Sequence, residues 1–382
     1  MDHKREIQDF ALWDKLKARR AAMSFDLEIT ARCNNDCRHC YINLPAGDRE
    51  AKARELTTGE LLGIAGQAVE LGAIWCLISG GEPLLREDFE AIYMGLKRKG
   101  LLLSVFTNAT LVREEHAALF RAFPPRDIEV TVYGVTEATY EQVSGRPGSF
   151  AAFKKGFDLL LESGVKIRLK AMAMRSNIHE MPAIREFCER HTKDYFRYDP
   201  MLHGRFDGDT GRNEMIRAER LTPEEIVGLE RADAKRFGAL EKNCDKLISP
   251  EFTHIGCDHL FHCGAGNGSF SVGYDGTFRL CSSLWAPGTT ADLRTMSLRE
   301  AWEKVVPRVR DMRSRKKEFL DTCRKCPLIN LCLWCPAHSH LEIGEMDVQV
   351  PYFCAVAHAR AKALQGEMGT APGKGAGEER SR

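Results

Sequence analysis

Residues 25–41 read FDLEITARCNNDCRHCY, a β-like run that leads directly into three closely spaced cysteines. Cys33, Cys37 and Cys40 follow the run with the spacing C-x3-C-x2-C. Three thiolates on one loop can surround a cube of iron and sulfide and leave its fourth iron without a protein ligand. The stretch therefore predicts a strand that carries a metal-binding loop at its carboxyl end.

Five further β-like runs follow, and amphipathic helical stretches separate them. The six predicted strands are 25–30, 73–79, 101–107, 128–133, 165–172 and 195–199. Strands that alternate with helices favour a parallel sheet with the helices outside. Six units are too few for a complete eight-fold barrel. We therefore expect an α/β fold, a partial (β/α)6 barrel, with chemistry at the carboxyl ends of its strands.

Charge and cysteine content limit the classes of function. The 382 residues carry a formal net charge of +1, so no global field favours nucleic acid or an anionic membrane. The charged N-terminus has no apolar region of a signal peptide, and no apolar run is long enough to span a membrane. We expect a cytoplasmic protein. Most of the 14 cysteines are clustered, which in a reducing compartment indicates metal binding rather than disulfides.

The pattern along the chain suggests four parts. We expect an N-terminal extension over 1–22, the partial barrel over 23–240, a C-terminal cysteine-rich iron–sulfur domain over 241–365 and a disordered tail over 366–382. Thr222 and Glu225 form a capping-box pattern that predicts a helix over about 222–237. Beyond about residue 250 apolar periodicity is weak, so we expect metal sites to hold that segment together.

The cysteine loop, with Tyr41 directly after it, resembles the signature of the radical S-adenosylmethionine (SAM) superfamily. The sequence Gly80-Gly81-Glu82 at the end of the second predicted strand resembles the superfamily's GGE motif. The resemblance implies that Cys33, Cys37 and Cys40 hold a 4Fe-4S cluster whose open iron binds the methionine part of SAM. One electron from this cluster would cleave SAM to a 5′-deoxyadenosyl radical, which abstracts hydrogen from a substrate.

The same resemblance implies a set of SAM-binding residues at the strand ends. They are Tyr41, Gly80, Gly81, Glu82, Thr107, Asn108 and Thr131. Thr107-Asn108 is similar to the family's TN pair, and Thr131 keeps a hydroxyl where many relatives have serine. Tyr133 replaces an aspartate of those relatives. Strand-end capping remains an alternative for the three polar residues. A zinc site with His39 as fourth ligand remains an alternative for the cysteine loop.

Eight C-terminal cysteines resemble the SPASM domain of radical SAM enzymes that act on peptides and proteins. Carried over by position, Cys257, Cys263, Cys281 and Cys335 would hold one auxiliary 4Fe-4S cluster, and Cys323, Cys326, Cys332 and Cys354 a second. Relatives usually separate the last close pair by three residues, whereas Cys332 and Cys335 are separated by two. A single zinc bound by the later four-cysteine run is the alternative.

The SPASM resemblance implies a ribosomally made peptide or a protein as substrate, with two auxiliary clusters for electron transfer. A separate recognition protein is expected for a peptide, and a reductant such as flavodoxin or ferredoxin. Sulfatase-maturing relatives place an acid directly after the cysteine that corresponds to Cys281, and this chain has Ser282. A dehydrogenase or epimerase of a small molecule and an electron-transfer protein are the alternatives. Arg197, Asp199 and His203 form either a polar lining or a strand-end ion pair.

Overall fold

The computed structural model describes residues 20–248, 257–332 and 334–368. Residues 1–19 of the predicted N-terminal extension and residues 369–382 of the predicted tail lie outside the described residues. The chain divides into two compact units. Unit 1 comprises residues 1–220, 259–313 and 335–346, and unit 2 comprises residues 221–258, 314–334 and 347–382. Each unit is assembled from separate segments of the chain, whereas the domains expected from the sequence are consecutive. The expected domain boundaries therefore remain predictions.

A nine-stranded sheet forms the centre of unit 1, in the order β11-β10-β9-β1-β4-β5-β6-β7-β8. Six neighbouring strands of this sheet pair in parallel, namely β1, β4, β5, β6, β7 and β8. Their bounds are Ser24–Thr30 (β1), Trp75–Gly80 (β4), Leu102–Thr107 (β5), Asp127–Thr131 (β6), Ile167–Met172 (β7) and Arg197–Asp199 (β8). All six correspond to the predicted strands, and the α/β fold of partial-barrel type is confirmed.

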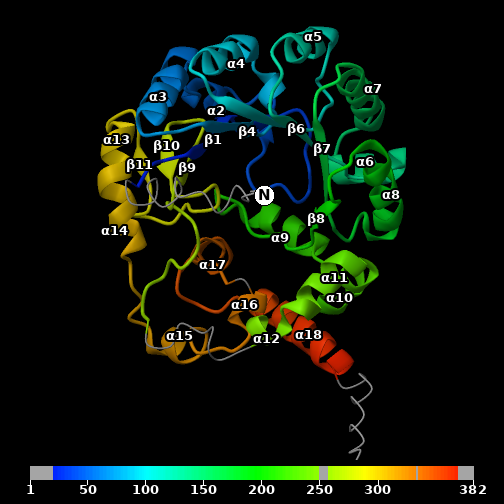
Figure 1. Cartoon of the computed structure of the whole chain (residues 1–382), viewed down its shortest axis with the longest axis vertical. Helices are drawn as coiled ribbons and strands as arrows, with labels where there is room; N and C mark the ends of the chain where they lie inside the picture. Colours follow the sequence, from blue (N-terminus) through cyan, green and yellow to red (C-terminus); the bar gives the residue numbers. More distant parts are fainter. Residues whose placement is uncertain (1–19, 249–256, 333, 369–382) are drawn as a thin grey trace, which may run out of the picture. The chain divides into compact units, whose positions relative to one another are not determined.

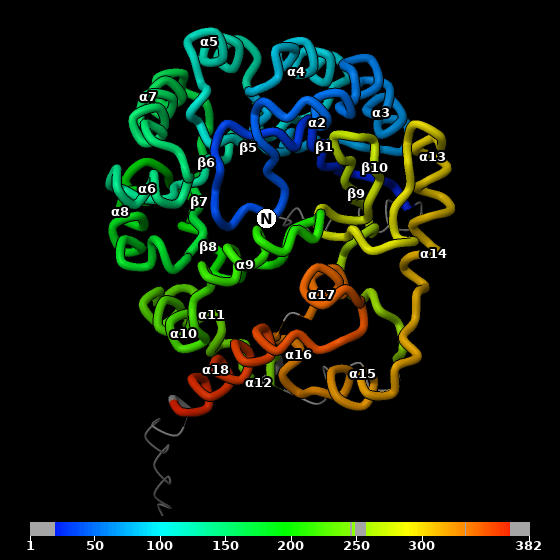
Figure 2. Tube along the Cα trace, turned by 180° about the vertical axis from the view of Figure 1, so that it is seen from behind, coloured from blue at the N-terminus to red at the C-terminus, as the bar shows by residue number. Residues whose placement is uncertain are grey.

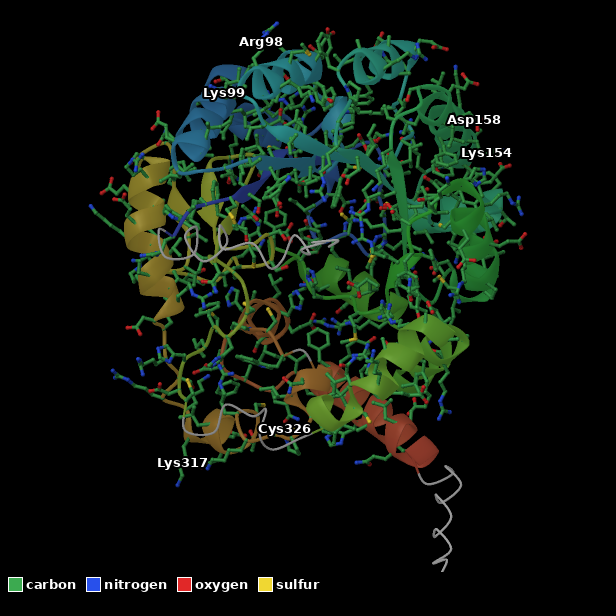
Figure 3. The ribbon with its side chains drawn as sticks, in the orientation of Figure 1. Arg98, Lys99, Lys154, Asp158, Lys317 and Cys326 are labelled. Carbon is green, nitrogen blue, oxygen red and sulfur yellow. The ribbon has the colours of Figure 1, made fainter. Side chains whose placement is uncertain are left out.

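Helices between the strands lie on the outer side of the curved sheet (Figure 1), and Figure 2 shows the same arrangement from behind. They are α3 (Thr58–Glu70), α4 (Phe89–Arg98), α5 (Glu114–Ala122), α6 (Glu137–Ser144), α7 (Ser149–Glu162) and α8 (Met181–His191). In Figure 3 the charged side chains of Arg98, Lys154 and Asp158 point away from the strands. The apolar faces of these helices pack inwards on the sheet.

Strand β1 shows how the sheet separates an apolar face from a polar face. Phe25, Leu27 and Ile29 are at most 1% exposed and alternate with Asp26 and Glu28. Because successive side chains of a strand point to opposite faces, the two acids lie on the face opposite the apolar residues. The helices cover the apolar face, so β1 presents its carboxylates towards the inside of the partial barrel.

Three strands beyond residue 250 extend the sheet and were not predicted. They are β9 (Ser269–Val272), β10 (Thr277–Arg279) and β11 (Ala291–Asp292). Strand β9 pairs in parallel with β1, and β10 runs antiparallel to β9. The rings of Phe25 and Phe270 stack with centroids 5.4 Å apart. This part of the C-terminal segment therefore shares an apolar core with the barrel, contrary to the expectation that metal sites alone would stabilise it.

The remaining elements of unit 1 are short. They are β2 (Arg32–Cys33), β3 (Leu44–Pro45), α2 (Arg49–Arg54), η2 (Pro83–Leu85), η3 (Ile178–Glu180), α9 (Thr210–Glu219), α13 (Leu298–Glu300), η5 (Ala301–Val305), α14 (Val306–Arg310) and α17 (Pro336–Ile343). Strands β2 and β3 pair with each other in parallel, separately from the large sheet.

Unit 2 is helical. Its elements are α10 (Pro223–Ala232), α11 (Ala234–Lys242), α12 (Cys244–Leu247), α15 (Lys317–Asp321), α16 (Ile329–Cys332) and α18 (Pro351–Met368). The capping box of Thr222 and Glu225 is present, but the helix predicted to reach residue 237 ends at Ala232. Asp233 accepts a hydrogen bond from the backbone N–H of Arg236 and starts a new helix there, so the single-helix prediction is wrong.

Buried charge and apolar packing hold the helices of unit 2 together. The Arg360 guanidinium donates to both carboxylate oxygens of Glu230, at 3.0 and 2.7 Å, which joins α18 to α10. Val227, Phe237 and Leu331 belong to one buried apolar cluster of this unit. Among the described residues we find no helix with the length and hydropathy needed to cross a bilayer.

Candidate functional site

The loop that carries Cys33, Cys37 and Cys40 is fastened to the barrel by backbone hydrogen bonds. The Asp36 N–H donates to the Ser144 carbonyl at 2.7 Å, at the end of α6. The Arg205 guanidinium donates to the Cys40 carbonyl at 3.1 Å and to both Asn43 oxygens. Arg205 is only 3% exposed, so this contact is buried. The three cysteines therefore sit on a loop whose conformation is set by the fold.

Gly80 and Gly81 allow the end of β4 to approach the start of the cysteine loop. A Cβ atom at Gly80, whose φ is +136°, would lie 2.0 Å from the Thr30 carbonyl oxygen. A Cβ atom at Gly81 would lie 2.3 Å from the Arg32 carbonyl oxygen. The Gly81 N–H donates to the Thr30 carbonyl at 2.7 Å. The two glycines thus fix where the loop leaves the sheet.

The carboxyl ends of the strands line a cavity in unit 1 that is partly open to solvent; its empty volume, including that open space, is about 1020 Å³. It brings together most of the predicted residues, namely Cys33, Cys37, Cys40, Tyr41, Gly80, Gly81, Thr107, Asn108 and Thr131. Asp26, Glu28, Phe106, Tyr133, Lys170 and Ser282 also line it. The roles assigned to the predicted residues remain predictions, although the fold places these residues around one space.

The buried thiols of this cavity favour the binding of a positively charged group. Burial is the main cause that raises the pKa of Cys37 to about 12, and it also raises the pKa values of Cys33 and Cys40. Thiolates at such positions need compensating positive charge, which bound iron supplies. No three His, Cys, Asp or Glu side chains of the described residues converge at single-ion distance. The donor set fits an iron–sulfur cluster, a group larger than one ion.

Several donors point at the sulfurs. The Asn35 backbone N–H lies 3.4 Å from the Cys33 sulfur, and the Asn108 side-chain amide lies 3.7 Å from it. The Tyr133 phenol lies close to Cys37, whose charge is, after burial, the next cause that raises the pKa of Tyr133. Hydrogen bonds to ligand sulfurs tune the reduction potential of a cluster. Sequence reasoning left Tyr133 without a role, since it departs from the family's aspartate and only the folded chain brings it to Cys37.

Glu82 stands behind the cavity rather than in its lining. It is fully buried, and its carboxylate accepts hydrogen bonds from the Thr107 hydroxyl at 2.9 Å and from the Asn108 N–H at 2.8 Å. The Leu84 N–H donates to it at 3.1 Å. Burial raises its pKa to about 7. Glu82 therefore joins β4 to β5, and a direct contact of its carboxylate with SAM stays a prediction.

The polar residues at the end of β5 cap the strand as well as line the cavity. The Thr107 hydroxyl accepts from the Ala109 N–H at 3.0 Å, and the Asn108 side-chain oxygen accepts from the Thr110 N–H at 2.9 Å. Ala109 adopts a φ of +62°. The capping alternative is therefore observed for Thr107 and Asn108, whereas Thr131 lies in the lining without such a bond among the described residues.

His39 does not line the cavity. Its ring packs edge-on against Tyr133 with centroids 5.5 Å apart. Burial, together with the nearby charge of Lys170, lowers the pKa of His39 to about 4. Of the three residues considered as a polar lining at the sixth strand, Arg197 forms an ion pair with Glu129. The strand-end ion pair is thus the observed arrangement for Arg197.

Three of the four cysteines predicted for the first auxiliary cluster lie near one another in unit 1. After burial, the charges of Cys335 and Cys263 are the next causes that raise the pKa of Cys281. Burial raises the pKa of Cys335, and the charge of Cys263 raises it further. Cys257 belongs to unit 2, where its charge acts on Arg324. The grouping of Cys257 with the other three stays a prediction.

All four cysteines predicted for the second auxiliary cluster line one cavity of unit 2. The cavity has an empty volume of about 580 Å³ and is lined by Cys323, Cys326, Cys332 and Cys354. Cys326 lies beside α16 in Figure 3. The Gln349 side-chain amide donates to the Cys354 sulfur at 2.9 Å. The apolar residues Leu328, Ile329, Val350 and Ala357 form part of the remaining wall.

Comparison with known families agrees with this arrangement of cysteines and strand ends. The radical SAM superfamily model matches residues 27–188, and the SPASM model, an iron–sulfur cluster-binding domain, matches residues 263–327. The chain belongs to the radical SAM superfamily. This membership implies an enzyme that uses SAM and 4Fe-4S clusters. Iron–sulfur binding is therefore favoured over zinc for both cysteine-rich regions.

Two similar proteins come from the same organism. An Fe-coproporphyrin III synthase of Methanosarcina barkeri is 26% identical over 80% of this chain and 80% of its own length. An AdoMet-dependent heme synthase of the same organism is 26% identical over 85% of this chain and 94% of its own length.

Solved radical SAM structures share the fold. Streptococcus suis SuiB bound to S-adenosylmethionine superposes with a TM-score of 0.64 at 16% identity, over 89% of this chain and 80% of SuiB. The enzyme anSMEcpe with bound AdoMet gives a TM-score of 0.62 at 14% identity, over 91% of this chain and 99% of its own length.

Proposed function

We propose that this protein is a radical SAM enzyme that cleaves SAM reductively and abstracts hydrogen from a ribosomally made peptide or a protein. The observation that carries the proposal is the cavity at the carboxyl ends of β1 to β7. It gathers Cys33, Cys37 and Cys40 with the strand-end groups of β4, β5 and β6. A cavity that is partly open to solvent can admit a chain segment as well as SAM.

The residues of the first site have distinct tasks. Cys33, Cys37 and Cys40 would hold the 4Fe-4S cluster, which when bound supplies the electron that cleaves SAM. Gly80 and Gly81 leave backbone groups accessible near the cluster loop. Asn108 and Thr131 offer an amide and a hydroxyl to the polar end of SAM. Glu82 holds Thr107 and Asn108 in place, because its buried carboxylate accepts from both residues.

We propose two auxiliary 4Fe-4S clusters for electron transfer, bound by the C-terminal cysteines. Eight thiolates fill the ligand positions of two such clusters, so neither has an iron free for SAM. Support for the second cluster is the shared cavity of Cys323, Cys326, Cys332 and Cys354. The proposal also includes a flavodoxin or ferredoxin as reductant, and a separate recognition protein if the substrate is a peptide.

Charge in the cavity supports a peptide over a porphyrin. Two carboxylates of β1, Asp26 and Glu28, line the cavity. Lys170 is a cation of the lining, and its ammonium is paired with Glu129 at 2.7 Å. A porphyrin with several carboxylates would be repelled by these two acids of the cavity wall. SuiB has been solved with its precursor peptide SuiA, and anSMEcpe with the Kp18Cys peptide, on the same fold.

A small-molecule reaction is the second candidate. It is favoured by the names of the two Methanosarcina barkeri relatives, an Fe-coproporphyrin III synthase and a heme synthase, which match along most of their length. Ser282 occupies the position of the acid in sulfatase-maturing relatives, so sulfatase maturation is not part of the proposal.

Mass spectrometry of candidate substrates distinguishes the two candidates. Cluster-loaded protein, reductant and SAM are incubated with pools of ribosomal peptides or with Fe-coproporphyrin III. We expect a mass change in a peptide and 5′-deoxyadenosine in proportion to it. Conversion of the porphyrin with no peptide modified would overturn the peptide proposal and support the second candidate. The protein with Cys33, Cys37 and Cys40 replaced by alanine is the control and should form no 5′-deoxyadenosine.

A further inference from the structure

Glu28 has a carboxylate oxygen that the protein itself does not use. The side chain is 1% exposed and lines the cavity that contains the cluster cysteines. One oxygen, Oε2, accepts a hydrogen bond from the Arg279 guanidinium. The other oxygen, Oε1, has no hydrogen-bond partner among the residues that the structure describes. A buried carboxylate oxygen without a donor is costly, and such positions commonly serve a ligand.

Asp26 and Glu28 interact with the same buried cation. Asp26 lies on the same face of β1 and accepts a hydrogen bond from the Ser271 hydroxyl at 3.1 Å. Arg279 is fully buried and is the cation whose charge acts on both acids. Two carboxylates therefore share one guanidinium. Lys170 also lines the cavity; it pairs with Glu129 at 2.7 Å, and Arg197 pairs with the same carboxylate.

Arg279 makes further contacts, although its Nε–H has no hydrogen-bond partner among the described residues. It donates to the Ser282 carbonyl at 2.5 Å, and its guanidinium lies 3.7 Å from the ring centroid of Trp285. The Trp285 indole N–H donates to the same carbonyl at 2.9 Å. Arg279 thus holds Glu28 on one side and Ser282 on the other, and both of these residues line the cavity.

We propose that Glu28, with Asp26 beside it, is a substrate-binding subsite that takes a cationic group, an ammonium or guanidinium, through the free oxygen of Glu28. The inference rests on the proposed function, because it takes this cavity as the reaction chamber. In a peptide substrate the bound group is a lysine or arginine side chain. Its charge adds a cation beside the two carboxylates, and its N–H supplies a hydrogen bond to the unpartnered oxygen of Glu28. Burial raises the pKa values of both acids, and a bound cation opposes that effect.

Binding of short peptides tests the subsite without turnover. The probes are acetyl-Gly-X-Gly-amides, with lysine, arginine, glutamine or glutamate as X, added to cluster-loaded protein with SAM and no reductant. Dissociation constants are measured by ligand-observed NMR. We expect the lysine and arginine probes to bind at least about tenfold more tightly than the glutamine probe. This preference should disappear in Glu28→Gln and persist in Asp158→Asn, which removes an exposed acid of α7.

Equal affinity for the lysine and glutamine probes in the unaltered protein would overturn the inference, as would an unchanged preference in Glu28→Gln. Iron content and SAM binding show whether that variant is folded. If it is not, Asp26→Asn replaces it, and retained preference there overturns the inference. Butylammonium is included as a probe that is not a peptide. If it binds in a Glu28-dependent way while no peptide is ever modified, the subsite stands and the peptide proposal fails.

Discussion

The phenol of Tyr133, at the end of β6, lies close to the Cys37 thiol of the cluster loop: after burial, the charge of Cys37 is the next cause that raises the pKa of Tyr133. Many relatives have an aspartate where this chain has Tyr133. A phenol is neutral, so it can donate to a cluster sulfur without adding negative charge. This contact makes the first cluster site of this chain chemically different from a site with a carboxylate at that position.

Loss of this donor should lower the reduction potential of the first cluster. Tyr133→Phe keeps the ring and removes the O–H that can donate to Cys37; one hydrogen bond contributes about 1 kcal/mol net, or ~40 mV for one electron. EPR-monitored redox titration in the presence of SAM measures the shift. Tyr140→Phe is the matched control, because the Tyr140 hydroxyl is buried nearby and has no partner among the described residues. An equal shift in both variants would mean that the contact with Cys37 has no specific effect.

A side chain at Gly81 should disrupt the cluster loop. Gly81→Ala places a Cβ atom 2.3 Å from the Arg32 carbonyl oxygen, where only backbone movement can relieve the overlap. We expect a loss of about 3 kcal/mol in the free energy of unfolding and reduced iron at the first site. Urea unfolding and iron analysis measure the two effects.

Gly63→Ala is the control for this substitution. Gly63 lies in α3, and a Cβ atom there has no neighbour within 4 Å. The change should stabilise the protein by about 0.5–1 kcal/mol, because alanine is the better helix former. If Gly81→Ala behaves in the same way, the close approach to the cysteine loop is not required for folding.

Glu82 should make stability depend on pH. Its pKa rises from the ordinary value of 4.5 to about 7 on folding, because burial disfavours the charged form. Between these pH values the folded chain binds more protons than the unfolded chain, so stability falls as pH rises. For the cluster-free protein we expect a loss of about 3 kcal/mol across this range. Urea unfolding at a series of pH values should show a shallower fall in Glu82→Gln; identical profiles would refute the assignment.

The sequence predicted the six parallel strands because each is an apolar run of ordinary length between helical patterns. It did not predict β9, a short strand whose pairing with β1 joins residues about 240 positions apart along the chain. The break at Asp233 was also missed, because the apolar pattern of α10 and α11 reads as one helix. Local periodicity contains no information on long-range pairing or on which of several caps is used.

At the candidate site, motif spacing identified the cysteines and the strand-end residues that the cavity gathers. Glu28 and Tyr133 were not assigned a role. Glu28 contacts Arg279 and Tyr133 lies near Cys37, and in both cases the partner is far away in the sequence. A signal for Glu28 was nevertheless present. Two acids, Asp26 and Glu28, alternate with fully buried apolar residues in a strand that leads to a metal-binding loop.

Iron content should report the number of clusters. Three 4Fe-4S clusters correspond to about 12 iron atoms per chain after anaerobic reconstitution, and dithionite should bleach their absorption. Replacing Cys33, Cys37 and Cys40 together should leave about 8 and abolish SAM cleavage. Zinc in the C-terminal region with only about 4 iron atoms would contradict the two auxiliary clusters. Continued SAM cleavage by the triple variant would show that another site activates SAM.

Removal of one ligand in unit 2 should separate SAM activation from substrate chemistry. Cys354 lines the cavity shared by Cys323, Cys326 and Cys332, whereas Cys244 is buried in an apolar cluster of the same unit. Cys354→Ala should therefore lose about 4 iron atoms, and Cys244→Ala should lose none. Because all ligand positions of an auxiliary cluster are filled by cysteine, SAM cleavage should persist in Cys354→Ala while product is lost. This comparison requires a soluble variant with the first cluster full, since metal loss can also unfold unit 2. If such a variant forms product normally, the second auxiliary cluster has only a structural role. If it loses all SAM cleavage, that cluster supplies the electron that cleaves SAM.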